Sequence, residues 1–354
     1  MSKQNAMYTD QELLWATQIA YCNVMDKDIG CTLQEIFAEY GDSFYYDQEI
    51  LKEIDGDKGI MAKEAKQFVD DVAAGKICQG WKLVSIGDDQ KKSGMFALTI
   101  ETGENEAIVA FRGSEAVNTD QLIKDWGWAD FCSINGKATD QEEMAYQYLK
   151  EVGAEFTYEN LTLTGHSLGG NLSHVATVYA YERKQELYSR IRQSVSFDGQ
   201  GHPQEYIQEH QKAIDAVQDK LMHYQWSAVG TILTSFCQGD NYQTVLSDKF
   251  SSIFGVFIKH ATESLRLNED GSLIRTEEKD WFASEVDKWT DWIDEKNDVQ
   301  LWASSLTHIV VHTADNCNEL KKWQLATLRN WRLSYERKSC ICDALLESYV
   351  LENL

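Results

Sequence analysis

The feature that most constrains the fold of this chain is a serine between two glycines, placed where a short strand meets a long apolar helix. Leu161–Thr164 reads as the strand, Gly165-His166-Ser167-Leu168-Gly169 follows it directly, and Leu172–Tyr181 has the composition of a buried helix. A G-x-S-x-G sequence in this context is typical of a sharp turn that exposes the serine at the edge of a sheet. The pattern predicts that Ser167 is a nucleophile, with a turn in a non-catalytic sheet protein as the alternative.

The residues around this turn alternate between strand and helix patterns from about residue 80 to 260. Residues 81–86 and 95–100 predict an antiparallel pair of strands, and residues 107–111 predict a buried strand. Further strands are predicted at 193–197, 221–226 and 242–246, with helices at 141–152, at 172–181 and near Pro203. This order predicts an α/β fold with a mostly parallel sheet and helices on both faces. The strands that end at Phe111, Thr164 and Phe197 should be parallel neighbours.

Both ends of the chain read as helical. Residues 12–21, 32–40 and 61–72 have apolar residues at helical spacing, and so do residues 282–292 and 320–335. We therefore predict a helical N-terminal extension over 1–75, a core over 76–279, and a helical C-terminal extension over 280–354 that packs on the core.

Charge and composition exclude several classes of function. The 354 residues include 57 acidic and 33 basic side chains, a formal charge of −24. Such a chain is repelled by phosphate backbones and anionic bilayers, so we expect no nucleic-acid partner and at most peripheral membrane contact. The eight cysteines lack zinc-site spacing, and the N-terminus lacks the apolar core of a secretory signal. We expect free thiols, and a location that is cytoplasmic or reached by export without a cleavable signal.

A second motif, Phe111-Arg112-Gly113-Ser114, stands at the end of a buried strand, and its Ser114 lies 53 residues before Ser167. Acyl-transfer enzymes need two hydrogen-bond donors for the developing oxyanion. One is the N–H of the residue after the nucleophile, and the loop after the third strand supplies the second. A glycine allows the backbone to turn toward the nucleophile. The motif predicts an oxyanion hole formed by Ser114 and Leu168.

Together the two motifs resemble the class 3 (fungal-type) lipase family and its uncharacterised bacterial lipase-like relatives. Asp125-Trp126 and Asp130-Phe131 also resemble the segment that this family carries between the motifs. The resemblance covers about residues 80–260. It implies an α/β-hydrolase fold, hydrolysis of carboxylic esters, and the roles of Ser167, Ser114 and Leu168 given above, with Arg112 supporting the loop.

The base of such an enzyme is a histidine on a loop after the final strand. His260 lies beyond the last predicted strand, and we choose it as the base, with His308 and His312 as the alternatives. His166 lies in the turn itself and points the wrong way to act on the adjacent serine.

The acid is predicted to be Asp198, which ends a strand in Phe197-Asp198-Gly199. The bacterial lipase-like relatives have a similar Asp-Gly-x-Gly turn, whereas most class 3 lipases place the acid after the next strand. That position is near Ser227 here, with Asp240 as the alternative acid and Asp248 as a weaker one. Asp198 as a turn residue also stays open.

These residues predict a serine hydrolase that cleaves lipid or other fatty-acyl esters through an acyl-enzyme intermediate. A catalytically silent hydrolase-fold protein that binds a partner is the alternative, as is a thioesterase or peptidase on the same fold. We expect no cofactor and no metal, because the sequence lacks phosphate-loop, dinucleotide and zinc-protease motifs.

Overall fold

The computed structural model describes residues 7–41, 60–113, 140–248, 259–279, 283, 284 and 287, with backbone only for 60–63. Several predictions lie outside these residues. They are the helix at 320–335, the helix at 282–292 apart from residues 283, 284 and 287, the Asp125–Phe131 segment, Ser114, and the two alternative bases His308 and His312.

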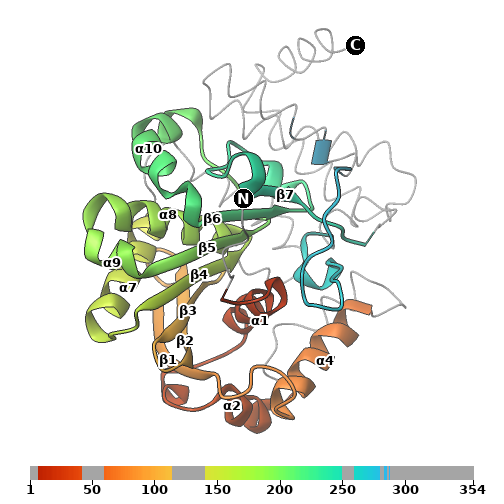
Figure 1. The fold of residues 1–354 in the computed structure, drawn as a ribbon. Coiled ribbons are helices and arrows are strands. Elements are labelled where there is room, and N and C mark those ends of the chain that lie inside the picture. The colour runs from red at the N-terminus through yellow and green to blue at the C-terminus, as the bar shows by residue number, and fades with distance from the viewer. Residues whose placement is uncertain are drawn as a thin grey trace, which may run out of the picture.

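The core of the described structure is a seven-stranded sheet whose strands follow one another in chain order (Figure 1). The strands are β1 (Lys82–Asp89), β2 (Met95–Gly103), β3 (Glu106–Phe111), β4 (Asn160–His166), β5 (Ile191–Phe197), β6 (Leu221–Gln225) and β7 (Tyr242–Thr244). β1, β2 and β3 pair antiparallel, and every pair from β3 to β7 is parallel. The predicted mostly parallel sheet, its antiparallel first pair and its parallel central strands are confirmed.

The register brings the carboxyl ends of the central strands to one edge of the sheet. Phe111 pairs with Gly165, and His166 pairs with Phe197. The residues that follow β3, β4 and β5 therefore lie at the same edge.

Four helices follow the parallel strands and cover one face of the sheet. They are α7 (Asp140–Glu155), α8 (Leu168–Arg183), the short α9 (Gln185–Arg190) and α10 (Gln204–Val217). α10 begins one residue after Pro203, which is its N-cap rather than a first-turn residue. Each crossover moves one strand further in the same direction, and right-handed crossovers of that kind place their helices on the same face. Figure 1 shows these helices on one side of the sheet.

On the opposite face α1 (Asp10–Ala20) packs against β2, β3 and β4, while α2 (Leu33–Tyr40) and α4 (Ile60–Ala73) pack against each other in the same hydrophobic cluster (Figure 1). Successive residues of β3 point to opposite faces: Val109 packs with the α7 and α8 side, and Ile108 packs with the α1 side. α1 starts with a capping box in which Thr9 and Glu12 bond to each other's backbone N–H, at 2.8 and 3.2 Å. The segment predicted as an extension thus supplies the second helical layer of the sheet.

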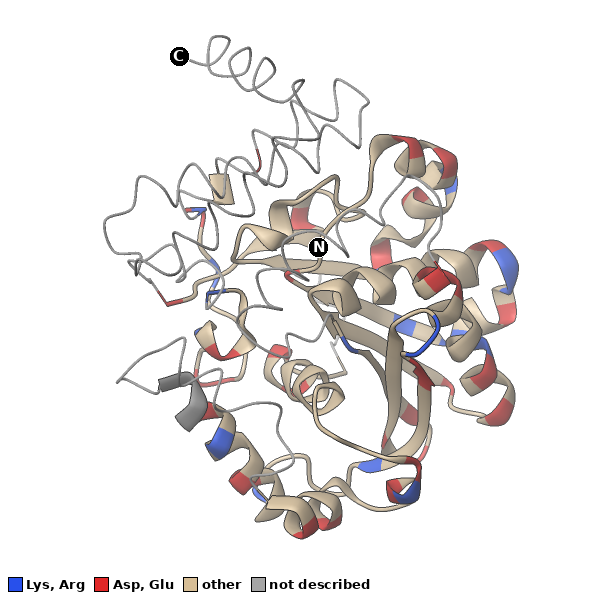
Figure 2. Ribbon diagram, turned by 180° about the vertical axis from the view of Figure 1, so that it is seen from behind, with Lys and Arg blue, Asp and Glu red and all other residues tan. Residues whose placement is uncertain are grey.

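Short 3-10 turns complete the described elements. They are η1 (Asp26–Asp28), η5 (Gln218–Lys220), η6 (Val229–Thr231), η7 (Gly239–Asn241) and η8 (Thr262–Ser264). Acidic and basic residues are interspersed over the outer helices and loops (Figure 2). Among the described residues, no helix combines the length and the apolar character that a bilayer span requires. Cys22, Cys31, Cys78 and Cys237, the cysteines that the structure describes, are free thiols.

Candidate active site

Ser167 stands at the junction of β4 and α8, at the carboxyl edge of the sheet. Its backbone has φ 56° and ψ −133°, a conformation that a residue with a side chain adopts only at a cost in energy. The Ser167 N–H donates to the carbonyl of Phe197 at 2.9 Å, which ties the turn to β5. The strained backbone and the strand–turn–helix order are those of a nucleophile elbow.

Two glycines allow α8 to start this close to the sheet. A Cβ at Gly169 would lie 2.1 Å from the carbonyl oxygen of Phe111, and one at Gly165 would lie 2.2 Å from the Gly169 backbone. Since backbone atoms cannot move aside locally, a side chain at either position would push α8 away from β3 and β4.

We therefore expect Gly169→Ala to destabilise the protein by about 2–3 kcal/mol, the usual cost of overpacking a well-filled interior. Gly103→Ala is the matched control, because the nearest atom to its Cβ would be a Glu106 carboxylate oxygen at 3.4 Å. The free energy of unfolding in urea measures both. Equal stability of the two variants would contradict the close packing described here.

The end of β3 meets the elbow at Gly113. A Cβ there would lie 3.0 Å from the Cβ of Ser167 and 2.6 Å from the carbonyl oxygen of His166. Arg112, the residue before it, is buried with its guanidinium 4.1 Å from the centre of the Phe96 ring. Leu168 is the first residue of α8, where a backbone N–H has no carbonyl within the helix to bond. Ser114, the other predicted oxyanion donor, lies outside the described residues.

The predicted acid and base are in contact. His260 Nδ1 lies 2.7 Å from Asp198 Oδ2, and the two side chains are 1% and 0% exposed. A carboxylate oxygen only accepts, so the imidazole donates from Nδ1, and its Nε2 is left as the basic nitrogen. That is the tautomer a general base requires.

Asp198 is held in the ionised state by its neighbours. The backbone N–H groups of Trp226 and Ser227 donate to Oδ1 at 3.0 and 3.1 Å, and the Ser227 hydroxyl donates to Oδ2. Burial raises the pKa of this carboxyl. The hydrogen bond and charge of His260, then the Ser227 hydroxyl and the Trp226 N–H, outweigh burial and hold the pKa below its ordinary value.

Ser227 is a member of this cluster that the sequence did not assign. Its hydroxyl lies 3.2 Å from His260 Nδ1 as well as against Asp198. It follows β6, the place where most class 3 lipases are expected to carry the acid. The sequence held one indication of this role. A serine stands where an acid is expected after β6, and an aspartate follows the preceding strand, β5.

The other candidate acids lie elsewhere. Asp240 is exposed in η7, before β7, and Asp248 forms an ion pair with Arg266. Apart from His166, the remaining described histidines make structural contacts. Those contacts are His174 with the Met222 carbonyl, His202 with Asn171, His210 with Glu182, and His223 with Ser196.

Trp226 packs beside the histidines of the site. Its ring lies 5.8 Å from that of His166 and 6.4 Å from that of His260, measured between centroids, and nearly parallel to both. The indole N–H donates to the Lys259 carbonyl at 2.6 Å, which anchors the loop that carries His260. Trp226 is itself buried, as are Asp198 and His260 beside it.

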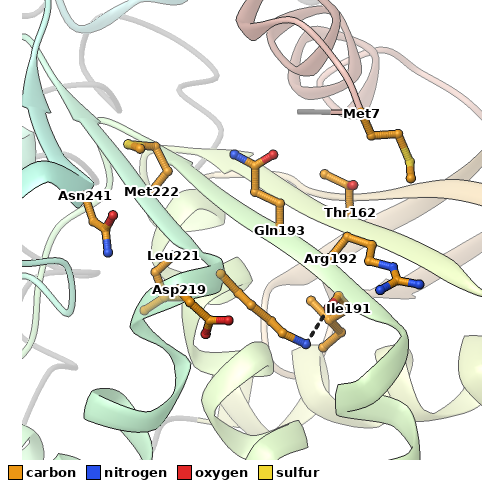
Figure 3. Close-up of a pocket in the computed structure, with 10 residues that line it drawn as sticks. Met7, Thr162, Ile191, Arg192, Gln193, Asp219, Leu221, Met222 and Asn241 are labelled. Carbon is orange, nitrogen blue, oxygen red and sulfur yellow. Dashed lines mark hydrogen bonds between the residues drawn. The ribbon is translucent and has the colours of Figure 1, made fainter. Parts of the chain in front are cut away.

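A separate cavity of about 410 Å³ opens near the amino ends of β5 and β6 (Figure 3). Thr162, Gln193 and Met222 line it from three neighbouring strands. Lys220, which also lines it, donates to the carbonyls of Ile191 and Tyr188 at 2.6 and 3.0 Å. The cavity thus lies toward the opposite end of the strands from Ser167, and its lysine holds the start of β5.

A mostly parallel sheet with a strained serine between β4 and α8 defines the α/β-hydrolase fold. A family model described as Mbeg1-like matches residues 82–306, so the chain belongs to this lipase-like family. The lipase-like relation indicated by the two motifs is confirmed.

Comparison with solved structures finds lipases at a distance. The M37 lipase is 16% identical, with 62% of this chain and 68% of that chain covered. A lipase from Rhizopus microsporus var. chinensis is 12% identical, with 70% of this chain and 86% of that chain covered. A Rhizomucor miehei lipase propeptide complex is also 12% identical, with 69% of this chain and 82% of that chain covered. The TM-score is 0.33 in each case, so the assignment of residues rests on this chain's own geometry. A comparison with curated proteins found no match.

Proposed function

We propose that this protein is a serine hydrolase that cleaves carboxylic esters, with fatty-acyl esters as its substrate class. The observation that carries the proposal is the buried Asp198–His260 pair, with its base-competent tautomer, at the sheet edge where Ser167 is strained. The lipase-like family supports the choice of esters.

In the proposed reaction, Ser167 Oγ attacks the ester carbonyl and His260 Nε2 takes the hydroxyl proton. Asp198 holds the imidazole and stabilises the imidazolium that forms. The oxyanion accepts hydrogen bonds from the N–H groups of Leu168 and Ser114. His260 then protonates the leaving alcohol, which leaves an acyl-enzyme, and water attacks this intermediate by the reverse sequence.

The test combines a covalent probe with a substrate series. A fluorophosphonate should label the protein once, on Ser167, as located by mass spectrometry of the digested protein. Nitrophenyl esters of rising chain length should be hydrolysed, with kcat/KM increasing toward the longer acyl chains because they bury more apolar surface. Labelling without ester turnover would favour another acyl substrate, such as a thioester. Absence of both would favour the catalytically silent, partner-binding alternative.

The compartment is also part of the proposal. The four free thiols that the structure describes support a reducing environment, and hence a cytoplasmic location.

A further inference from the structure

Tyr21, the C-cap residue of α1, reaches the active-site edge of the sheet from the N-terminal layer. Its hydroxyl is 3.1 Å from the backbone N of Gly113 and 3.1 Å from Nδ1 of His166. On the other side of the same imidazole, His166 Nε2 lies 2.8 Å from the carbonyl oxygen of His260. One row of hydrogen bonds therefore joins the ends of α1 and β3, the elbow, and the loop of the proposed base.

The direction of every bond in this row is fixed by its two ends. The His260 carbonyl can only accept, so His166 Nε2 carries the proton. Burial, and then repulsion from His260 whenever that residue is protonated, lower the pKa of His166 to about 3, so its ring is neutral at working pH and Nδ1 is an acceptor. Tyr21 donates to that nitrogen at 3.1 Å, the shorter of its two contacts with His166, whose carbonyl oxygen lies at 3.5 Å. The Gly113 N–H can only donate, and the Tyr21 oxygen accepts it.

A neutral His166 is also what the proposed reaction requires of this neighbour. The rings of His166 and His260 lie 4.4 Å apart between centroids. His260 becomes an imidazolium when it takes the Ser167 proton, and a second cation at this distance in a buried site would oppose that charge. The row of bonds keeps His166 uncharged while holding the backbone of His260 in place.

At the other end of the row, Gly113 is the residue immediately before Ser114, the proposed oxyanion donor. Gly113 has no space for a side chain, since a Cβ would lie 2.4 Å from the Tyr21 hydroxyl oxygen. The tyrosine hydroxyl thus sets the orientation of the peptide that leads into the oxyanion loop.

We propose that Tyr21 is a positioning residue of the active site, whose hydroxyl aligns the Gly113 peptide and, through His166, the His260 loop. The proposal rests on the proposed ester hydrolase function. It assigns a role in the reaction to the N-terminal helical layer, 92 residues from Gly113 and 145 from His166 in sequence.

The test is Tyr21→Phe, which removes the hydroxyl and keeps the ring. We expect kcat for a nitrophenyl ester to fall roughly 10- to 100-fold, because misplacement of a reacting group by about 1 Å costs that much. KM should change little, since substrate binding is not altered. Tyr8→Phe is the matched control: Tyr8 precedes the same helix, is buried, and its hydroxyl bonds Thr102 Oγ1 at 2.5 Å. It should lose no more than about twofold in kcat, a change typical of a site far from the chemistry.

Two outcomes would overturn the proposal. One is an equal kcat for Tyr21→Phe and Tyr8→Phe. The other is a His166 that carries its proton on Nδ1, or is cationic between pH 5 and 9, in ¹⁵N spectra of histidine-labelled protein. The His166 signal is identified by its absence from a His166→Gln variant. The spectrum is recorded on the wild-type protein and does not need Tyr21→Phe, so it judges the hydrogen-bond row even where that variant fails to fold.

The failure of the proposed function has a different signature. In that case the wild-type protein itself does not react with the fluorophosphonate, whatever the tautomer of His166. A wild-type protein that reacts, with Tyr21→Phe reacting at the same rate, would instead remove the positioning role and leave the hydrolase proposal standing.

Discussion

Replacement of Ser167 by alanine is expected to lower kcat on the order of 10⁶-fold, leaving only the residual acceleration that binding and the oxyanion hole supply. The serine sits alone at the apex of the elbow, where φ is 56°, and α8 begins at the next residue. Loss of its hydroxyl removes the atom that forms the acyl-enzyme, and water would have to attack without covalent catalysis. Ester turnover and fluorophosphonate labelling should both disappear.

Ser173→Ala is the matched control for this experiment. Ser173 is buried in α8, six residues after Ser167, and its hydroxyl donates to the Gly170 carbonyl at 2.7 Å. It should keep nearly the full kcat, with at most a modest loss of stability. If Ser167→Ala keeps its activity while folded, the elbow is not the active site and the hydrolase proposal fails.

The elbow was predictable because all of its information is local. A strand, two glycines and a helix within 21 residues dictate the turn, and the sheet register then follows from parallel pairing of buried strands. The strand itself continues two residues beyond the predicted end, to His166, because the turn begins only at Ser167.

The place of α1 was less accessible to sequence reasoning. Its apolar spacing predicts a helix, but the acidic N-terminal segment reads equally well as an outer extension. Because the sheet's strands follow chain order, the crossover helices fall on one face, and the other face needs a separate cover. Strand order is a long-range property that a single sequence does not reveal. For the same reason the contacts of Tyr21 could not be found from spacing, because they join it to Gly113 and His166, which lie 92 and 145 positions further along the chain.

The choice between candidate acids also depends on long-range packing. Asp198 follows the carboxyl end of β5, and Asp240 precedes the amino end of β7. Only the fold shows which of the two carboxylates contacts His260. Asp198 has φ 53°, a conformation that aspartate and asparagine tolerate better than most residues, so the site is compatible with the turn that the sequence indicates.

Asp198→Asn is expected to lower kcat about 10⁴-fold, because an amide facing His260 Nδ1 no longer enforces the base-competent tautomer. Asparagine suits the positive φ, so the backbone should be retained. Asp240→Asn is the control. Its side chain is exposed in η7, and kcat should change by no more than about twofold, as for most surface substitutions. A crippled Asp240→Asn beside an active Asp198→Asn would move the acid to the later position.

Ser227 offers a sharper version of this test. Its hydroxyl lies 3.2 Å from His260 Nδ1, and a carboxylate at this position would meet the same nitrogen from the end of β6. In Asp198→Asn combined with Ser227→Asp, the amide at 198 can donate to the new carboxylate. We expect kcat to rise on the order of 10- to 100-fold above that of Asp198→Asn alone, because the imidazole regains an acceptor in contact with Nδ1.

Ser227→Asp alone should impair the enzyme, since it places two carboxylates together in a buried site, where one of them must take up a proton. Recovery in the double variant together with loss in the single one would show that the imidazole needs one carboxylate and accepts it from either strand. A double variant no better than Asp198→Asn would restrict the role to Asp198 and its own hydrogen bonds from Trp226 and Ser227.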